Sequence, residues 1–245
     1  MHGTKPYGHA TAQSTVFGVQ DMGELAARLG SINTYDRRGN VFWTDDFGDG
    51  SLLGKWPTIV HTAITVEVGL STGRSKSGAF SALVAFTAAA LAADFGWFRS
   101  RVAFPHLVKT GAEVSFSSPT HTHEIMLQMD RNDGATIYTA RVTYNEFTDV
   151  LAYLDDAGVY QPLATMQVSS LAYSVLKLVI DLSTNKYVRL IFNDTEYDLS
   201  TRNIRAQALV DAPALDIILR STLVNNAVAV SRTYFADVIL TTNEP

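Results

Sequence analysis

The sequence predicts an all-β fold in which two antiparallel sheets pack as a sandwich, preceded by an N-terminal extended arm and one short helix. From Val41 onward, apolar residues recur at every second position, which is the period of a strand with one buried face. In the second half, turn-forming residues recur about every ten positions, a spacing typical of a β-sandwich rather than of alternating strands and helices. A chain of 245 residues, 47% of them hydrophobic, is long enough to bury one large core.

The N-terminal segment lacks this two-residue period. We expect residues 1–18 to form an extended polar arm and the following DMGELAARLG to form the helix. Asp21 can cap that helix, and Glu24, three residues later, completes a capping box. One apolar face of the helix consists of Met22, Leu25, Ala26 and Leu29. The chain therefore divides into an arm and helix over residues 1–40 and a β-sandwich domain over residues 41–245.

The clearest strands form a predicted three-stranded meander. LKLVIDL (176–182) and YVRLIF (187–192) alternate apolar and polar residues around a Ser-Thr-Asn turn, and TEYDL follows a second turn. We expect six alternating side chains to point into one core: Leu176, Leu178, Ile180, Val188, Leu190 and Phe192. Further strands are predicted at ALDIIL and RTYFADVILT near the C-terminus. Hairpin turns are predicted at Asn-Asp-Gly (132–134) and at Asp-Asp-Ala-Gly (155–158).

Composition argues against several classes of function. The formal net charge is −5 and no Lys/Arg run is present, so we expect no nucleic-acid partner. The absence of cysteine excludes disulfides, thiolate metal sites and a cysteine nucleophile. The polar N-terminus lacks the apolar core of a signal peptide. Residues 78–93 are uncharged but fall short of the about 20 residues that cross a membrane, so they predict a buried strand and no membrane contact.

The two ends of the predicted sandwich carry a family resemblance. WTDDFGDGSLLGKW (43–56) resembles the entry segment of concanavalin A-like lectin/glucanase jelly rolls, which often start with a pattern like DDFxDGSLxxW. LKLVIDLSTNKYVRLIFNDTEYDLS resembles the back-sheet hairpins of that superfamily, and YFADVILTTNEP resembles its closing strand, which pairs near the first. The resemblance covers residues 41–245 and implies a jelly roll. It implies no single activity, because the superfamily includes sugar-binding domains, glycanases and many virion or surface proteins.

The entry segment contains a cluster of acidic residues. Asp45, Asp46 and Asp49, together with two glycines, offer the hard oxygen ligands that Ca²⁺ prefers. Their spacing departs from the EF-hand, because no Glu occupies the closing position. The alternative is that these residues form turns and hydrogen-bond the local backbone. We expect no cofactor, with Ca²⁺ at these aspartates as the open alternative. Three aromatic residues are expected in the core rather than as a sugar platform: Trp43, Phe47 and Trp56.

The glucanases of this fold carry their acids on one strand face in an E-x-D-x-E-like run, and the nearest segment is HEIMLQMD. Here Glu124 and Asp130 share a face, with Met126 and Gln128 between them. Six residues span about 20 Å in a strand, whereas glycosidase carboxyls lie about 5–9.5 Å apart. No other strand offers two acids on one face. We therefore predict no catalytic residues and no enzyme.

Two further groups of residues have open alternatives. His121 and His123 in THTHE can share a face and bind a metal, but no third ligand is visible, which favours surface or turn positions. A sugar could stack on tyrosines that lie near acidic residues, namely Tyr153 and Tyr160 beside Asp155 and Asp156. Ordinary cross-strand packing is the interpretation that we favour for these tyrosines.

These features favour a non-enzymatic virion structural protein, such as a capsid-decoration or tail component of a bacteriophage, attached through its N-terminal segment. The arm has no evident role inside a sandwich, and the helix has an apolar face outside it. The expected location is a virion, with the cytoplasm or the extracellular space as alternatives. The expected partners are copies of the chain in a homo-oligomer, or capsid and tail proteins. A carbohydrate-binding module that holds a glycan is the alternative from a different class, followed by a glycan hydrolase.

Attachment is expected to use five apolar residues: Phe17, Val19, Met22, Leu25 and Leu29. Ordering a backbone costs about 1–2 kcal/mol per residue, and burying a large apolar side chain contributes roughly 1.5–3 kcal/mol. Docking all five against a neighbouring subunit would therefore offset much of the entropy that the arm loses.

Overall fold

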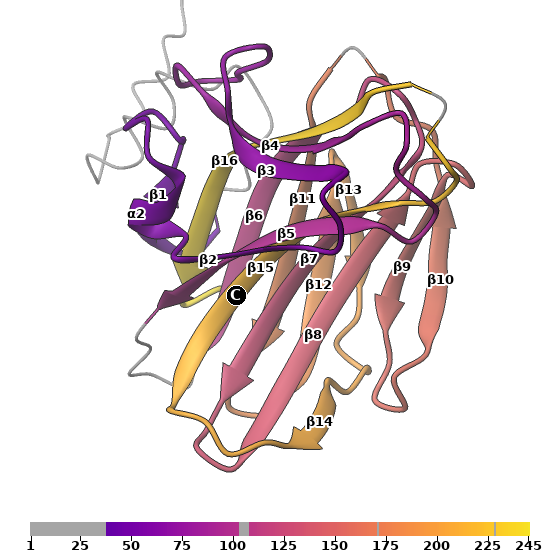
Figure 1. Ribbon diagram of the computed structural model, residues 1–245. Helices are drawn as coiled ribbons and strands as arrows, with labels where there is room; N and C mark the ends of the chain where they lie inside the picture. Colours follow the sequence, from indigo (N-terminus) through magenta and orange to yellow (C-terminus); the bar gives the residue numbers. More distant parts are fainter. Residues whose placement is uncertain (1–37, 103–107, 171, 228) are drawn as a thin grey trace, which may run out of the picture. The chain divides into compact units, whose positions relative to one another are not determined.

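The computed structural model describes residues 38–102, 108–170, 172–227 and 229–245 (Figure 1). Within these ranges the chain is mostly β-strand, as the period-two pattern predicts. The predicted arm and helix lie outside the described residues, so the domain boundary at residue 40 stays a prediction. The helix that the structure does show is α2 (Leu52–Lys55), a single turn in the entry segment. No helix in the described part of the chain is long and apolar enough to cross a membrane.

Two antiparallel sheets form the sandwich, which confirms the predicted fold class. The front sheet has the strand order β10-β9-β8-β7-β15-β5-β2, with β14 paired to β8. The back sheet has the order β13-β12-β11-β6-β16-β4-β3, with β1 paired to β16. In Figure 1 the front sheet lies toward the viewer. The strands are β1 (Asn40–Asp45), β2 (Thr58–His61), β3 (Val66–Ser71), β4 (Ser81–Phe86), β5 (Phe95–Val102), β6 (Lys109–Ser117), β7 (His123–Asn132), β8 (Thr136–Asn145), β9 (Val150–Leu154), β10 (Tyr160–Thr165), β11 (Ser174–Asp181), β12 (Lys186–Phe192), β13 (Thr195–Asp198), β14 (Arg205–Ala208), β15 (Ala214–Leu223) and β16 (Ser231–Thr242).

The predicted meander is confirmed as β11, β12 and β13, which are neighbours in the back sheet. Five of the six side chains expected in its core are buried: Leu176, Leu178, Ile180, Leu190 and Phe192. The exception is Val188, which is only partly buried. The register shifts between Val179 and Ile180, so Ile180 pairs with Tyr187 and Tyr187 takes the core position. A bulge of one residue exchanges the two faces of a strand, and the period-two count does not reveal it.

Both predicted hairpin turns are confirmed. Asn132 and Asp133 accept hydrogen bonds from backbone N–H groups of the β7–β8 turn, where Gly134 has a φ of 103°. In the β9–β10 turn, Asp155 Oδ1 accepts a hydrogen bond from the Val159 backbone N–H at 2.8 Å. These sequences form turns for two reasons. Short polar side chains hydrogen-bond the local backbone, and glycine adopts a positive φ without strain.

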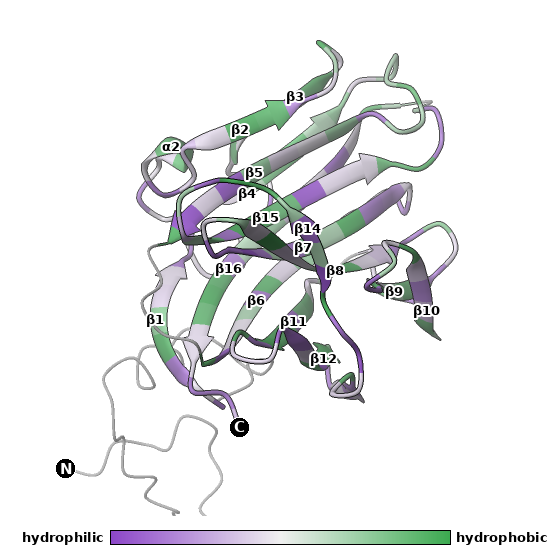
Figure 2. Cartoon of the chain, turned by 90° about the horizontal axis from the view of Figure 1, so that it is seen from below, coloured by the Kyte–Doolittle hydropathy of each residue, from purple (hydrophilic) through white to green (hydrophobic). Residues whose placement is uncertain are grey.

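The core lies between the two sheets and is filled by alternate residues of their strands. Figure 2 shows hydrophobic and hydrophilic residues alternating along many of these strands. The first described strand, β1, pairs with the last, β16, from Asn40 opposite Thr242 to Asp45 opposite Val238. This pairing of opening and closing strands is the arrangement that the resemblance implies.

Aromatic residues anchor the entry segment to this core. Trp56 is fully buried, and its ring meets the Phe98 ring edge-on with 4.8 Å between centroids. Phe47 is also buried and stacks on Trp56 at 6.1 Å, while Trp43 packs against Trp56 at 5.6 Å. The three aromatic residues of the entry segment are therefore packed in or against the core, as predicted.

Candidate functional site

The candidate site is the outward face of the front sheet, turned away from the core. Antiparallel pairing aligns its side chains in rows across β5, β15, β7 and β8, the four strands that run side by side in Figure 1. What we call the front face is the set of outward residues on five strands. It consists of Phe95, Trp97, Arg99 and Arg101 on β5, Asp216, Ile218, Arg220 and Thr222 on β15, Glu124, Met126, Gln128 and Asp130 on β7, Thr139, Arg141 and Thr143 on β8, and Tyr160 on β10. Several of its polar members are buried, which distinguishes this face from one that only meets water.

The central row runs from Arg99 to Arg141, with Gln128 between them. Arg141 Nε donates a hydrogen bond to Gln128 Oε1 at 2.6 Å, and Arg141 Nη1 donates one to the Tyr160 hydroxyl at 3.1 Å. Gln128 is only 6% exposed, so it is held in place by packing as well as by this bond. These contacts fix the Arg141 guanidinium while using only part of its five N–H groups.

The next row holds two carboxylates side by side. Asp130 of β7 lies directly opposite Asp216 of β15. Arg101 donates two hydrogen bonds to Asp216, at 2.8 and 2.9 Å, and Arg99 Nη1 lies 3.4 Å from the same carboxylate. Asp130 instead accepts a hydrogen bond from Gln128 Nε2 at 2.5 Å. Burial raises the pKa of Asp130, and the charge of Asp216 adds to the rise.

On the other side of the central row lie Arg220 and Glu124. The Arg220 guanidinium stands over the Phe95 ring, 4.0 Å from its centroid, and its Nε donates to Thr222 Oγ1 at 2.8 Å. Burial lowers the pKa of Arg220, although the nearby Glu124 opposes this change. Burial raises the pKa of Glu124, and the positive charges of Arg220 and Arg141 oppose the rise. The front face thus contains several ionisable groups whose pKa values are displaced, as is typical of functional sites.

The sequence indicates part of this face but not its paired acids. Glu124 and Asp130 do share a face of β7, as the alternation predicts. The close pair is Asp130 with Asp216, which belongs to a strand far along the chain. Alternation shows which residues of one strand share a face, whereas it contains no information on which strands are neighbours.

The three aspartates considered as calcium ligands bond their own segment. Asp45 Oδ2 accepts a hydrogen bond from Trp56 Nε1 at 2.7 Å, and its Oδ1 accepts one from Lys55 Nζ at 2.9 Å. Asp46 and Asp49 each accept a hydrogen bond from the backbone N–H two residues later. Among the described residues, no three His, Cys, Asp or Glu side chains are grouped so that they could hold a metal ion. These contacts support the turn-forming alternative, and the calcium alternative stays a prediction.

His123 does not occupy the surface or turn position that we expected. It begins β7, is fully buried, and packs its ring against Phe86 with 5.1 Å between centroids. Its Nδ1 lies 3.3 Å from Ser221 Oγ, and its Nε2 lies 3.2 Å from Thr120 Oγ1. Burial lowers the pKa of His123 to about 3, so the ring is neutral near pH 7. His121 lies in the bend before this strand, as expected.

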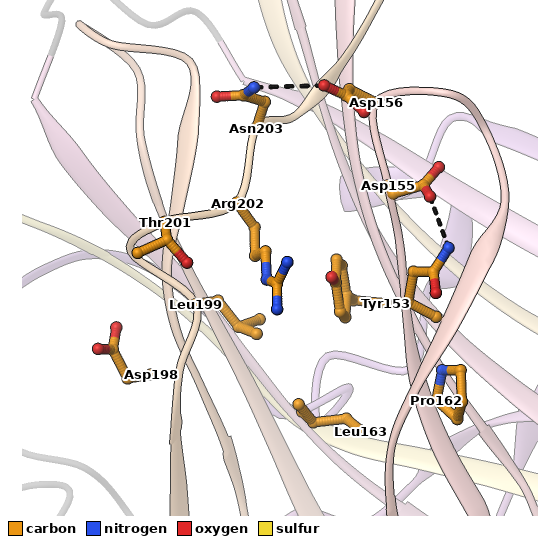
Figure 3. Close-up of a pocket in the computed structure, with 11 residues that line it drawn as sticks. Tyr153, Asp155, Asp156, Pro162, Leu163, Asp198, Leu199, Thr201, Arg202 and Asn203 are labelled. Atoms are coloured by element: carbon orange, nitrogen blue, oxygen red, sulfur yellow. Dashed lines mark hydrogen bonds between the residues drawn. The ribbon is translucent and has the colours of Figure 1, made fainter.

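A polar cavity of about 550 Å³ lies beside the β9–β10 hairpin, lined also by the segment that follows β13 (Figure 3). Tyr153 faces Arg202 there, with the guanidinium carbon 5.9 Å from the ring centroid. Tyr153 is 5% exposed and packs against Tyr187 at 5.6 Å, which supports cross-strand packing as its role. Tyr160 is instead 39% exposed, on the front face, where a ligand can reach it.

The acidic residues of this cavity have local partners. Asp155 Oδ2 accepts a hydrogen bond from Gln161 Nε2 at 2.7 Å, and Asp156 Oδ2 accepts one from Asn203 Nδ2 at 3.2 Å (Figure 3). Because these bonds hold the hairpin and the segment after β13, we assign the two aspartates a structural role.

No family model and no curated protein matches the sequence. Solved structures do match. An alginate lyase from Chlorella virus is 9% identical with a TM-score of 0.57, and the match covers 83% of this chain and 100% of that one. An endo-β-1,4-glucuronan lyase from the fungus Trichoderma reesei is 13% identical with a TM-score of 0.55, covering 83% of this chain and 96% of that one. A sialidase is 12% identical with a TM-score of 0.51, and the match covers 84% of this chain but 19% of the sialidase.

At these identities the likeness shows the fold alone. The fold is a two-sheet jelly roll, as the resemblance of the entry and closing segments implies. This result corrects one expectation and weakens another. The prediction that the protein is not an enzyme is overturned, because solved structures of this fold include two lyases and a sialidase. Nothing in the comparisons supports a capsid or tail protein.

Proposed function

We propose that the protein binds a carbohydrate chain on the front face. The observation that carries this proposal is the hydrogen-bonded set of Arg141, Gln128 and Tyr160, which crosses the middle of an outward sheet face. Such convergent polar groups on a partly buried surface are the usual mark of a ligand site. The two lyases that share the fold are named for alginate and glucuronan, which supports a carbohydrate as the ligand.

The chemistry of the front face suits sugar hydroxyls, which both donate and accept hydrogen bonds. The guanidinium of Arg141 supplies donors, while the Asp130 carboxylate and the Gln128 amide oxygen supply acceptors nearby. Tyr160, which is 39% exposed beside these polar groups, offers an aromatic surface for the apolar face of a sugar ring.

A glycan array probed with the full-length protein, with and without Ca²⁺, tests this proposal. We expect binding to at least one class of glycan and its loss in Gln128→Ala. Gln161→Ala is the matched control, because it removes the same side chain from the cavity of Figure 3. Melting temperatures of both variants establish that they are folded. Binding to no glycan, or loss of binding in Gln161→Ala but not in Gln128→Ala, would show that the proposal is wrong.

Cleavage of the bound chain is a second candidate function, favoured by Asp130 and Asp216. Residues directly opposite each other on antiparallel strands have Cβ atoms about 4.5–5.5 Å apart, and retaining glycosidases hold their two carboxyls about 5–5.5 Å apart. Burial raises the pKa of Asp130, which suits a group that donates a proton to the glycosidic oxygen. Asp216, paired with Arg101, supplies the nucleophile, whose carboxylate oxygen bonds to the sugar carbon as the glycosidic bond breaks and Asp130 protonates the leaving oxygen. Water, deprotonated by Asp130, then hydrolyses the bond between Asp216 and the sugar.

New reducing ends, measured after incubation with the glycans that bind, test this second function. Both Asp130→Asn and Asp216→Asn are expected to stop their release, while melting temperatures show that both variants stay folded. Release of reducing ends by both variants at the wild-type rate would exclude the pair from the reaction.

A further inference from the structure

We propose that the glycan bound at the front face is acidic, a chain whose sugars carry carboxylates that Arg141 and Arg220 recognise. The inference rests on the proposed function and adds the chemical class of its ligand.

The front face contains four arginines, namely Arg99, Arg101, Arg141 and Arg220. Among the described residues, two of these arginines are paired with carboxylates and two are not. Asp216 neutralises the two on β5, and Arg101 also pairs with Asp211 at 2.7 Å. Arg141 and Arg220 form no ion pair within 4 Å in the part of the chain that the structure describes. One half of the front face is therefore neutralised by direct ion pairs, whereas Arg141 and Arg220 in the other half have only the more distant carboxylates of Glu124 and Asp130 near them.

The neutral partners of these two cations hold them in place without removing their charge. Arg141 is fixed by Gln128 and Tyr160, and Arg220 by Thr222 and the Phe95 ring beneath it. A partly buried cation that forms no ion pair is unfavourable, and a second cation nearby adds to the effect. A bound carboxylate offsets both the desolvation of the cation and its repulsion by the second cation. It also matches the planar guanidinium, with which it can form two parallel hydrogen bonds.

The positions of the two arginines favour a chain over a single sugar. Arg141 lies on β8 and Arg220 on β15, with β7 between them and an offset of two residues along the strands. Strands about 4.8 Å apart and a rise of about 3.4 Å per residue place their Cα atoms about 12 Å apart. An oligosaccharide that crosses β7 can therefore present one carboxylate to each arginine.

Glu124 opposes this ligand and makes the inference sharply testable. The charged side chains that act on Glu124 are Arg220 of β15 and Arg141 of β8. When Glu124 is ionised it repels an anionic sugar, and when it is protonated the front face gains one net positive charge. Because burial raises the pKa of Glu124, this change takes place at a higher pH than for an exposed glutamate. Binding is expected to strengthen as the pH falls through that pKa.

Isothermal titration of the full-length protein with polyuronate oligosaccharides provides the test. The probes are alginate, polygalacturonate and glucuronan oligosaccharides, each compared with the same oligosaccharide after chemical reduction of its carboxyl groups. We expect reduction to weaken binding at least tenfold. Arg141→Gln and Arg220→Gln are each expected to weaken binding about tenfold to a hundredfold, the range for loss of a charged hydrogen bond. Glu124→Gln is expected to strengthen binding and to reduce its pH dependence.

Arg232→Gln is the matched control, because it makes the same change of charge at an exposed position on the back sheet. If it weakens binding as much as Arg141→Gln, the attraction is unspecific and the inference is overturned. Reduced oligosaccharides that bind as well as acidic ones also overturn it, while glycan binding stands. Binding to neither probe set nor to any array glycan rejects the proposed function itself. Arg141→Lys, which keeps the charge but not the planar fork, provides a second variant if Arg141→Gln does not fold.

Discussion

Asp45→Ala is expected to destabilise the β-sandwich more than alanine at Asp46 or Asp49. Asp45 is 2% exposed and accepts three hydrogen bonds, from the Trp56 indole N–H at 2.7 Å, Lys55 Nζ at 2.9 Å and the Phe47 backbone N–H at 3.0 Å. The substitution leaves two of these donors in the interior without an acceptor. The carboxylate is therefore expected to hold the entry segment against the core.

The magnitude follows from the groups left unpaired. A buried donor without a partner costs about 1–3 kcal/mol, so the indole and the Phe47 N–H together give a loss of roughly 2–6 kcal/mol. The Lys55 side chain is 36% exposed and turns to water, so it contributes little. Asp46 is exposed and accepts one hydrogen bond from Gly48, so Asp46→Ala is expected to cost less than about 1 kcal/mol.

Urea denaturation of the wild type and both variants, in EDTA and again with excess Ca²⁺, measures these losses. The wild type and Asp45→Ala are expected to differ by the same free energy of unfolding in both buffers. Equal losses for the two variants would refute the anchoring argument. A difference that disappears in EDTA would show that Asp45 acts through a bound calcium ion instead.

Three further predictions concern other parts of the chain. Burial raises the pKa of Glu146 to about 7, so its ionisation opposes folding. Between pH ~4.5 and pH ~7, the free energy of unfolding of the wild type is therefore expected to fall by about 3 kcal/mol relative to that of Glu146→Gln. Melting temperatures of the two proteins that run parallel across this range would contradict the prediction. The Tyr187 hydroxyl donates a hydrogen bond to the Leu154 carbonyl at 2.7 Å and accepts one from the backbone N–H of Arg141 at 2.9 Å. Tyr187→Phe is therefore expected to lower the free energy of unfolding in urea by about 1–3 kcal/mol and to weaken glycan binding. Unchanged values in both assays would refute this prediction. Deleting residues 1–30 is expected to leave a folded sandwich and to abolish self-association in sedimentation experiments, and a truncated chain that still associates, or that unfolds, would exclude an attachment role for that segment.

Much of the described fold follows from alternation and turn chemistry. Leu176, Leu178 and Ile180 are buried because a strand that lines the core turns one apolar face toward it, and the alternation of apolar residues in the sequence predicts that face. Val188 departs from its predicted place because one extra residue in β12 changes the face. A bulge depends on the pairing of two strands, so neither strand alone predicts it.

The sequence predicts less of the candidate site than of the fold, because the site also depends on how strands pair. The alternation in β7 correctly places Glu124 and Asp130 on one face, but Asp216 joins them only through the pairing of β7 with β15. Arg141 and Arg220 likewise come from two strands on either side of β7. Sites built across a sheet depend on long-range strand order, which is set by the packing of the whole domain rather than by any local pattern.

The methionine methyl groups provide the most direct test of where the glycan binds. Met126 lies on the front face beside Arg220, whereas Met129 faces the core and is 0% exposed. Met166 lies beyond the end of β10, partly buried against the core. In spectra of protein labelled with ¹³C-methyl methionine, added glycan is expected to shift the Met126 resonance in proportion to the bound fraction and to leave Met129 and Met166 in place. An unmoved Met126 at saturating glycan, or shifts confined to Met166, would contradict binding at the front face.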